Sequence, residues 1–402
     1  MPARYADFHV VQAVPASLLN RSEDDTPKTQ VFGNTIRAMV SSQCWKRAIR
    51  TDLEAELGEY AARTRMVPLR VADALRTAGW PTDLATFAGA QVARSATRKG
   101  LSTDPEQDGL TLAMLFLRRD AIDDLAALCQ SHRPALEEAA ARQATQHTTP
   151  PQASKQRRKK ESEDPAGALP TREVAALIKQ RTASISLFGR MLAEVPGAHV
   201  DGAVQMAPAF TVHKSNRQPD YLTAVDDWLD AEEAGSAHLQ TGFFTTGVLY
   251  RYATVNYTEL LANLGGDHTQ ARHLLALFAE FFIFSLPQAK KTATAPHTLP
   301  HLVHYVVRDR RPISYAAAFE QPIQAAHTGG YTQPTLQALS DHAAGITRLT
   351  GTRRRIAHGH TTINDKPIDH LGTHHSSFDD LIDACTTAAA NPTTSTPEPV
   401  TA

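Results

Sequence analysis

Apolar and polar residues follow two different periods along this chain, and the change between them predicts an α/β fold. The stretch DFHVVQAVPAS (residues 7–17) is apolar on both faces, which predicts a buried β-strand that ends at Pro15. NTIRAMVSS (34–42) predicts a second strand. Apolar residues then recur every four positions, which predicts a helix with one core-facing stripe: Trp45, Ile49, Leu53 and Leu57.

The rest of the chain alternates between helical and strand-like segments. Residues from about 60 to 145 are rich in Ala, Leu and Arg and predict helices. HTTPPQASKQRRKKESEDPAGALP (147–170) has paired prolines, a basic block and an acidic block, which is typical of a linker. TGFFTTGVLYRYATVN (241–256) is the most strongly strand-like run. Long excursions from one sheet predict a single α/β core with insertions.

Composition narrows the class of protein. The chain has 402 residues, a formal net charge of −1 and a pI of about 7.0, so any anionic partner must be bound by local patches. Three widely spaced cysteines without a CxxC pair indicate a reducing compartment. The N-terminal apolar run is too short for a signal peptide, and no apolar run reaches the roughly 18 residues of a membrane span. We therefore expect a soluble cytoplasmic protein with no membrane partner.

The start of the predicted helix carries the most informative chemistry. Lys46, Arg47 and Arg50 lie in its opening turns, where the helix dipole disfavours cations. A bound phosphate would reverse that penalty, and Gln43 with Ser41 or Ser42, which also supplies an N-cap, would add hydrogen bonds. The alternative is a solvated basic face partly balanced by acids that follow on the same helix.

Other charged or aromatic groups each have an ordinary explanation beside a functional one. Arg21 and Lys28 are loop cations near that helix, and the acidic loop SEDD (22–25) is either turn chemistry or a metal site for phosphodiester cleavage. KQRRKK (155–160) is either a solvated linker or a nucleic-acid patch. Lys290 and Lys291 follow a predicted helix end, where the dipole favours them without any ligand.

The aromatic and histidine residues can likewise be structural or functional. The aromatic residues at 244, 250 and 252 share one face of a strand, where they either pack in the core or stack on bases. The histidines at 358, 360, 374 and 375 lack zinc-like spacing. No motif forms a convincing catalytic set, and we expect no metal and no cofactor.

One ordered series of segments is more specific than any single motif. LLNR.EDD…K…VFG, SSQCWKRAIR, GRM, VDGAVQMAPAFTVH, DYLTAVDDW, GSAHLQTGFFTTGVLYRYATVN and ELLANLGG follow in this order. The series resembles the backbone subunit of the type I-E CRISPR Cascade complex, the CasC family of the RAMP superfamily. The resemblance runs from about residue 8 to about residue 325 and is strongest over 19–50 and 200–266.

The resemblance implies an α/β (α+β) fold: a ferredoxin-like, RRM-type palm with a helical fingers insertion and a thumb loop. The implied bounds are palm 1–59, fingers 60–175 with a disordered basic linker at about 148–168, palm 176–210, thumb 211–241, palm 242–390 and a disordered tail 391–402. It also implies a non-catalytic subunit that oligomerises along CRISPR RNA and presents the guide to target DNA. Its partners would be further copies and the large, small, guide-processing and 5′-handle-binding subunits.

The resemblance also implies which residues contact the guide, and adds cations and thumb positions to the helix start. They are Arg21, Lys28, Ser41, Gln43, Lys46, Arg47, Arg50, Met191, His213, Thr223, Lys290 and Lys291. Tyr221 and Leu222 stand where the family can show an aromatic thumb wedge, so this chain departs from the family there. Two alternatives remain: a metal-dependent ribonuclease subunit like the type III backbone proteins, and a stand-alone single-stranded RNA-binding protein.

Overall fold

The computed structural model describes residues 4–107, 109–147, 167–224 and 238–391. They form two compact units: residues 1–53 with 203–402, and residues 54–202. The fingers insertion expected at 60–175 falls within the second of these units. The predicted linker 148–168, the middle of the predicted thumb and the predicted tail lie almost entirely outside the described residues.

The first unit is built on one ten-stranded sheet. Its path runs β14–β13–β12–β1–β11–β9–β3–β2, and β8 and β10 also pair with β11. The strands are β1 Arg4–Ser17, β2 Thr29–Phe32, β3 Thr35–Val40, β8 Val204–Met206, β9 Ala209–Thr211, β10 Gln218–Ala224, β11 His238–Asn256, β12 Leu302–Asp309, β13 Arg355–Thr362 and β14 Thr373–His374. β1 continues past Pro15, because a register shift between Val14 and Ser17 accommodates the proline.

The centre of this sheet has the predicted ferredoxin-like order. β12, β1, β11 and β8 are neighbours, and each pair is antiparallel. Along the chain they alternate with two helices, giving β1–α1–β8–β11–α10–β12. The predicted α/β class with a ferredoxin-like core is therefore confirmed.

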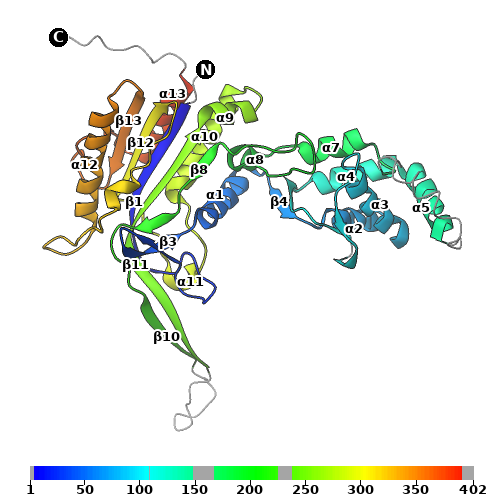
Figure 1. The fold of residues 1–402 in the computed structure, drawn as a ribbon, viewed down its shortest axis with the longest axis horizontal. Coiled ribbons are helices and arrows are strands. Elements are labelled where there is room, and N and C mark those ends of the chain that lie inside the picture. The colour runs from blue at the N-terminus through cyan, green and yellow to red at the C-terminus, as the bar shows by residue number, and fades with distance from the viewer. Residues whose placement is uncertain (1–3, 108, 148–166, 225–237, 392–402) are drawn as a thin grey trace, which may run out of the picture. The chain divides into compact units, whose positions relative to one another are not determined.

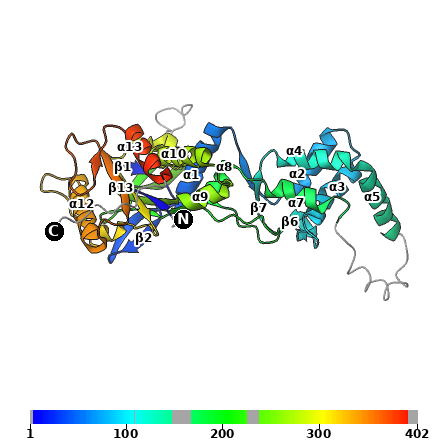
Figure 2. The same ribbon diagram turned by 90° about the horizontal axis from the view of Figure 1, so that it is seen from above.

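Helices cover one face of the sheet and pack against it through a buried aromatic cluster (Figures 1 and 2). They are α1 Ser42–Leu57, α9 Tyr257–Asn263, α10 His268–Phe284 and α13 Phe378–Ala390. Phe8 of β1 packs against Phe278 and Phe282 of α10, with ring centroids 6.3 Å apart in both pairs. The helices α9 and α10 both have side-chain N-caps: the side chains of Asn256 and Asp267 accept backbone N–H bonds at 3.2 and 2.9 Å.

The opposite face is covered by the segment that follows β12. It contains the short helix η3 Ala316–Phe319 and α12 Thr332–Thr350, which lies across the sheet from α10 and α13 (Figure 2). Tyr250 and Tyr252 are buried beneath this layer, and Tyr250 lies 5.0 Å from Phe319 between ring centroids. Core packing is therefore the role of these two tyrosines, and base stacking by them is wrong.

The second unit is mainly helical, as predicted, but it also contains short strands that the sequence did not reveal. Its elements are β4 Ala61–Thr64, α2 Val67–Thr77, α3 Thr82–Ser95, β5 Thr103–Asp104, η1 Pro105–Gln107, β6 Leu110–Thr111, β7 Leu115–Arg118, α4 Ala121–Ser131, α5 Arg133–His147, α7 Thr171–Lys179 and α8 Ala183–Phe188. β4 pairs with β7, and β5 pairs with β6. None of the helices in the described residues of the chain is long and apolar enough to cross a membrane.

Imidazoles that are buried or partly buried on β12 and β13 predict an acid-sensitive fold. Burial lowers the pKa of His358 and His360 to about 4, and burial lowers that of His304 well below its usual range. Between pH 6.5 and about 4 the unfolded chain then binds protons that the folded chain does not, so the free energy of unfolding falls as the pH is lowered. Burial raises the pKa of Asp7 to about 6, which opposes this trend below pH 6.

His360→Gln should flatten this dependence. The substitution removes one such proton, so the slope of unfolding free energy against pH should fall by up to about 1.4 kcal/mol per pH unit between pH 4 and 6.5. Urea titrations at several pH values measure it. The exposed His327, as His327→Gln, is the matched control and should leave the slope unchanged. An equal effect of both substitutions would contradict the assignment.

Candidate nucleic-acid interface

The start of α1 has the geometry of an anion site. Ser41 is the N-cap: its Oγ accepts the Cys44 N–H at 3.3 Å, and its carbonyl accepts the Trp45 N–H at 3.1 Å. The first turn of the helix contains no acidic residue. Helix N-terminal amides together with nearby cations are a standard arrangement for binding phosphate.

The predicted cations follow directly on this helix and differ in how they are held. Arg47 is exposed and forms no ion pair within the described residues, whereas Lys46 and Arg50 are half-buried. The Lys46 ammonium donates to the Val204 carbonyl at 3.2 Å, which directs this side chain toward β8. The exposed Gln43 lies beside them. The structure thus brings Ser41, Gln43 and all three cations to one end of one helix.

Two acids on the same helix were the candidates for balancing these charges. Asp52 accepts a hydrogen bond from the Ser285 hydroxyl at 2.6 Å, and Glu54 is buried and accepts one from the Ser184 hydroxyl at 2.6 Å. Both acids therefore have structural hydrogen bonds of their own. Asp52 is half-buried and Glu54 is buried, so neither acid lies on the exposed surface of the helix.

The loop with Arg21 and Lys28 is joined to the helix start by Asn20. The Asn20 Oδ1 accepts the Ser41 N–H at 2.9 Å, and the Asn20 carbonyl accepts the Lys28 N–H at 2.9 Å. The Lys28 carbonyl in turn accepts the Met39 N–H at 2.8 Å, at the end of β3. One asparagine therefore fixes the loop base against the helix cap, and sequence reasoning missed it because nothing in its local pattern marks this contact.

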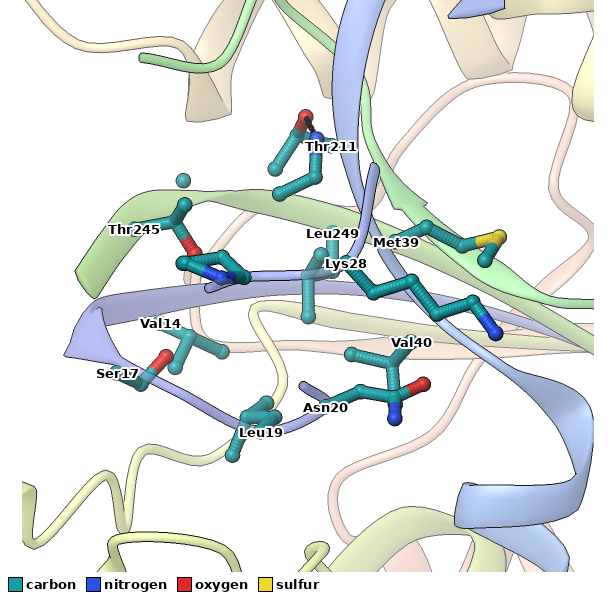
Figure 3. A pocket seen from close by; sticks show the side chains of 13 residues that line it. Val14, Ser17, Leu19, Asn20, Lys28, Met39, Val40, Thr211, Thr245 and Leu249 are labelled. Atoms are coloured by element: carbon teal, nitrogen blue, oxygen red, sulfur yellow. Dashed lines mark hydrogen bonds between the residues drawn. The ribbon is translucent and has the colours of Figure 1, made fainter. Parts of the chain in front are cut away.

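Asn20 and Lys28 both line a small cavity of about 20 Å³ between the ends of β1 and β3 and the middle of β11 (Figure 3). Their side chains extend in the same direction there, whereas apolar residues such as Val14 and Leu249 form the opposite wall. Burial of polar groups at this depth is tolerated because the backbone around them is hydrogen-bonded. The cavity is the size of a single water molecule and is too small for a phosphate group.

The acidic part of the same loop is accounted for by turn geometry. Arg21 and Asp25 form an ion pair of 2.6 Å, Asp25 has a positive φ of 58°, and Ser22 and Thr26 close the loop through 2.8 and 2.9 Å hydrogen bonds. Among the described residues, no group of three His, Cys, Asp or Glu side chains could hold a metal ion, whether here or at the clustered histidines. Turn chemistry therefore explains Asp25.

The predicted thumb positions lie on and beside the β10–β11 hairpin, with mixed outcomes. Tyr221 is 62% exposed in β10. The backbones of Leu222 and Thr223 pair with Gln240 and Leu239, and their side chains lie outside the described residues. His213 is buried, donates from Nδ1 to the Lys214 carbonyl at 2.8 Å, and accepts the Val248 N–H at Nε2. Its ring also stacks on Tyr331, and both ring nitrogens already have hydrogen-bond partners within the protein.

Met191 belongs to the second unit and is 85% exposed. It follows Arg190, whose buried guanidinium donates to five backbone carbonyls, those of Phe116, Ile178, Lys179, Gln180 and Ala198. Burial lowers the pKa of Arg190 to about 10. These bonds fix the position of Arg190, the residue directly before the exposed Met191.

Lys290 and Lys291 do not lie at a helix end as the sequence suggested. α10 ends at Phe284, and the two lysines begin the short helix α11 Lys291–Thr294. Lys290 is exposed with a left-handed φ of 52°. The dipole argument for two unliganded lysines therefore fails, since a helix start disfavours cations. The basic block 155–160 lies outside the described residues.

Comparisons with known proteins agree over nearly the full length. Residues 6–384 match the sequence profile of the CT1975-like protein family. Comparison with curated proteins gives no match. A chain of the solved structure "CRISPR RNA-guided surveillance complex, pre-nicking" is 38% identical, with a TM-score of 0.84 over 96% of this chain and 100% of that one.

A chain of a second structure, "CRISPR RNA-guided surveillance complex", is 34% identical, with a TM-score of 0.75 over 96% of this chain and 99% of that one. Both matches span 96% of this chain, so they include most of each of its two units. Together with the match of residues 6–384, they show that this chain belongs to the CT1975-like family of Cas proteins.

Proposed function

We propose that this chain is a non-catalytic, CRISPR RNA-binding backbone subunit of a type I-E Cascade surveillance complex. The observation that carries the proposal is the capped start of α1, where three cations gather and Asn20 holds the Lys28 loop against them. Two similar chains come from structures titled as CRISPR RNA-guided surveillance complexes. Phosphate bound here would position the guide and leave its bases free to pair.

The covered sheet also supports binding through the guide backbone rather than through its bases. In RRM-type folds the open sheet face stacks bases, but here η3 and α12 occupy that face. The protein surface that remains for RNA is the α1 end and the β10–β11 hairpin, where Tyr221 or Leu222 would act as the thumb wedge. Met191, Thr223, Lys290 and Lys291 remain proposed contacts, while His213 supports the hairpin base from the inside.

The proposal includes the partners that such a subunit needs. Copies of the chain would assemble along the guide, with target DNA bound through the guide and the other Cascade subunits at the ends and along the side. The residues 60–175 would be the fingers and 211–241 the thumb, in a cytoplasmic complex. A metal-dependent ribonuclease subunit is disfavoured, because Asp25 is paired with Arg21.

Assembly mass tests the proposal directly. Light scattering after co-expression with CRISPR RNA and the other subunits should show mass rising in whole-subunit steps as the guide spacer is lengthened. The same complexes, incubated with complementary RNA and magnesium, should leave that RNA intact. A monomer of constant mass would favour the stand-alone RNA-binding protein, and cleavage lost in Asp24→Ala/Asp25→Ala would favour the ribonuclease.

The helix start can be tested by its salt dependence. Lys46→Glu with Arg50→Glu should weaken guide binding for all sequences alike and lower the log–log salt slope by about 1.4, because two single-strand phosphate contacts are lost. Fluorescence anisotropy over a range of salt concentrations measures it. Arg98→Glu with Lys99→Glu changes two exposed cations of the second unit by the same charge and should leave the slope unchanged. An unaltered slope in the first variant would remove α1 from the site.

The positioning role of Asn20 predicts coupling to Lys28. Asn20→Ala keeps every cation but releases the loop, so guide affinity should fall roughly fivefold, the equivalent of about 1 kcal/mol for a lost hydrogen bond. In a double-mutant cycle, Asn20→Ala should add little once Lys28→Ala is present. Asn364→Ala, on a loop after β13, is the control. Independent, additive losses would show that Asn20 serves stability alone.

A further inference from the structure

A second group of cations lies at the other end of the sheet, where β12 ends and β13 begins. The Asp309 N–H donates to the Arg354 carbonyl at 3.1 Å, and Arg308 pairs with Arg355 in the strand register. Arg355 also donates to the Thr347 hydroxyl at 2.9 Å, which joins this corner to the last turn of α12. The segments joined here, 309–311 and 348–355, contain six arginines, which we call the arginine corner: Arg310, Arg311, Arg348, Arg353, Arg354 and Arg355.

The charges of this corner are not balanced locally. Asp309 is the only acid within residues 309–311 and 348–355, and its Oδ1 lies 3.6 Å from Nη1 of Arg354. Arg308 does not contribute to the surface, because it is buried and paired with Asp7 at 3.2 Å. These two segments therefore contain six arginines and one acid, although the net charge of the whole chain is only −1.

The backbone of the corner holds these side chains outward. Arg310 has a left-handed φ of 69°, in a turn closed by the Arg311 N–H to the Asp309 carbonyl at 2.9 Å. The facing turn is closed by the Arg355 N–H to the Thr352 carbonyl at 3.0 Å. Arg310, Arg311, Arg353 and Arg354 are all exposed. A bulky residue is uncommon at positive φ, so this presentation is maintained by the surrounding hydrogen bonds.

The arginine corner is separate from the α1 interface. β1 begins at Arg4, which pairs with Asp309, and ends at Ser17, shortly before Asn20 (Figure 1). At about 3.3 Å per residue, its 14 residues place the two sites roughly 40 Å apart. A strand whose phosphates lie against α1 therefore reaches the arginine corner only by crossing the whole sheet.

We propose that the arginine corner binds the phosphate backbone of a second nucleic-acid segment. Guanidinium groups pair with phosphate through two parallel hydrogen bonds, and the corner contains arginine but no lysine. An acidic protein partner fits less well: the centres of protein interfaces are rich in aromatic residues and poor in charge, and residues 309–311 and 348–355 contain no aromatic side chain. Because the contact is to phosphate, it is independent of sequence.

The test measures duplex DNA binding by the full chain in the Lys46→Glu/Arg50→Glu background, which removes the α1 contacts. We expect salt-dependent binding of a 20-base-pair duplex to remain. Adding Arg310→Gln, Arg311→Gln and Arg353→Gln should lower the log–log salt slope by about 2.7, three duplex phosphate contacts, and leave the melting temperature unchanged. Arg354 is kept because it pairs with Asp309.

Matched substitutions separate this effect from total charge. Arg70→Gln, Arg98→Gln and Arg142→Gln remove three exposed arginines of the second unit and should leave the slope unchanged. Equal slopes for the two triple variants would overturn the proposal. So would a corner variant that binds duplex normally but no longer assembles with the other subunits, since that result identifies an acidic protein partner. Because the α1 contacts are already removed in this background, the duplex salt slope reports on the corner alone, so failure of the corner and failure of the α1 interface are distinguishable.

Discussion

A single buried guanidinium joins the elements on which the rest of the first unit depends. Arg251, in the middle of β11, lies 4.1 Å from the ring of Trp45 on α1 and donates to the Gln12 side chain of β1 at 2.7 Å. It also donates to the Phe282 carbonyl on α10. Burial lowers its pKa to about 9, so it remains charged at neutral pH. Because an unpaired buried charge is strongly unfavourable, these partners must all stay in place.

This constraint sets the orientation of α1, and with it the interface. Trp45 lies one position before Lys46 and two before Arg47. If the helix rotated, the Trp45 ring would leave the Arg251 guanidinium and these two cations would change direction with it. The N-cap bond of Ser41 and the Asn20 contact act at the end of the same helix. The cations thus owe their position to one buried cation–π contact and two polar contacts. Helix propensity alone would leave that rotation undetermined.

The sequence predicted the central strands, α1 and its cations, because their periods and caps are local properties. It could not predict that β1 passes Pro15, since the bulge depends on pairing with β11. Nor could it place Asn20 or bury His213, whose partners Ser41 and Val248 are distant in sequence. The arginine corner was missed for the same reason: residues 310 and 354 become neighbours only through the β12–β13 register.

Covering both faces of the sheet has a consequence for where chemistry is possible. With α10 and α13 on one side and α12 on the other, the described part of the sheet leaves strand ends, edge strands and the β10–β11 hairpin accessible to ligands. Strand ends are where turns present several side chains from segments distant in sequence. Both cation groups occur there, at opposite ends of β1, and each is held by backbone hydrogen bonds to its neighbouring turn. The layers that cover the two faces therefore also fix the turns that present both cation groups, so that cations are displayed at the strand ends while the core stays covered.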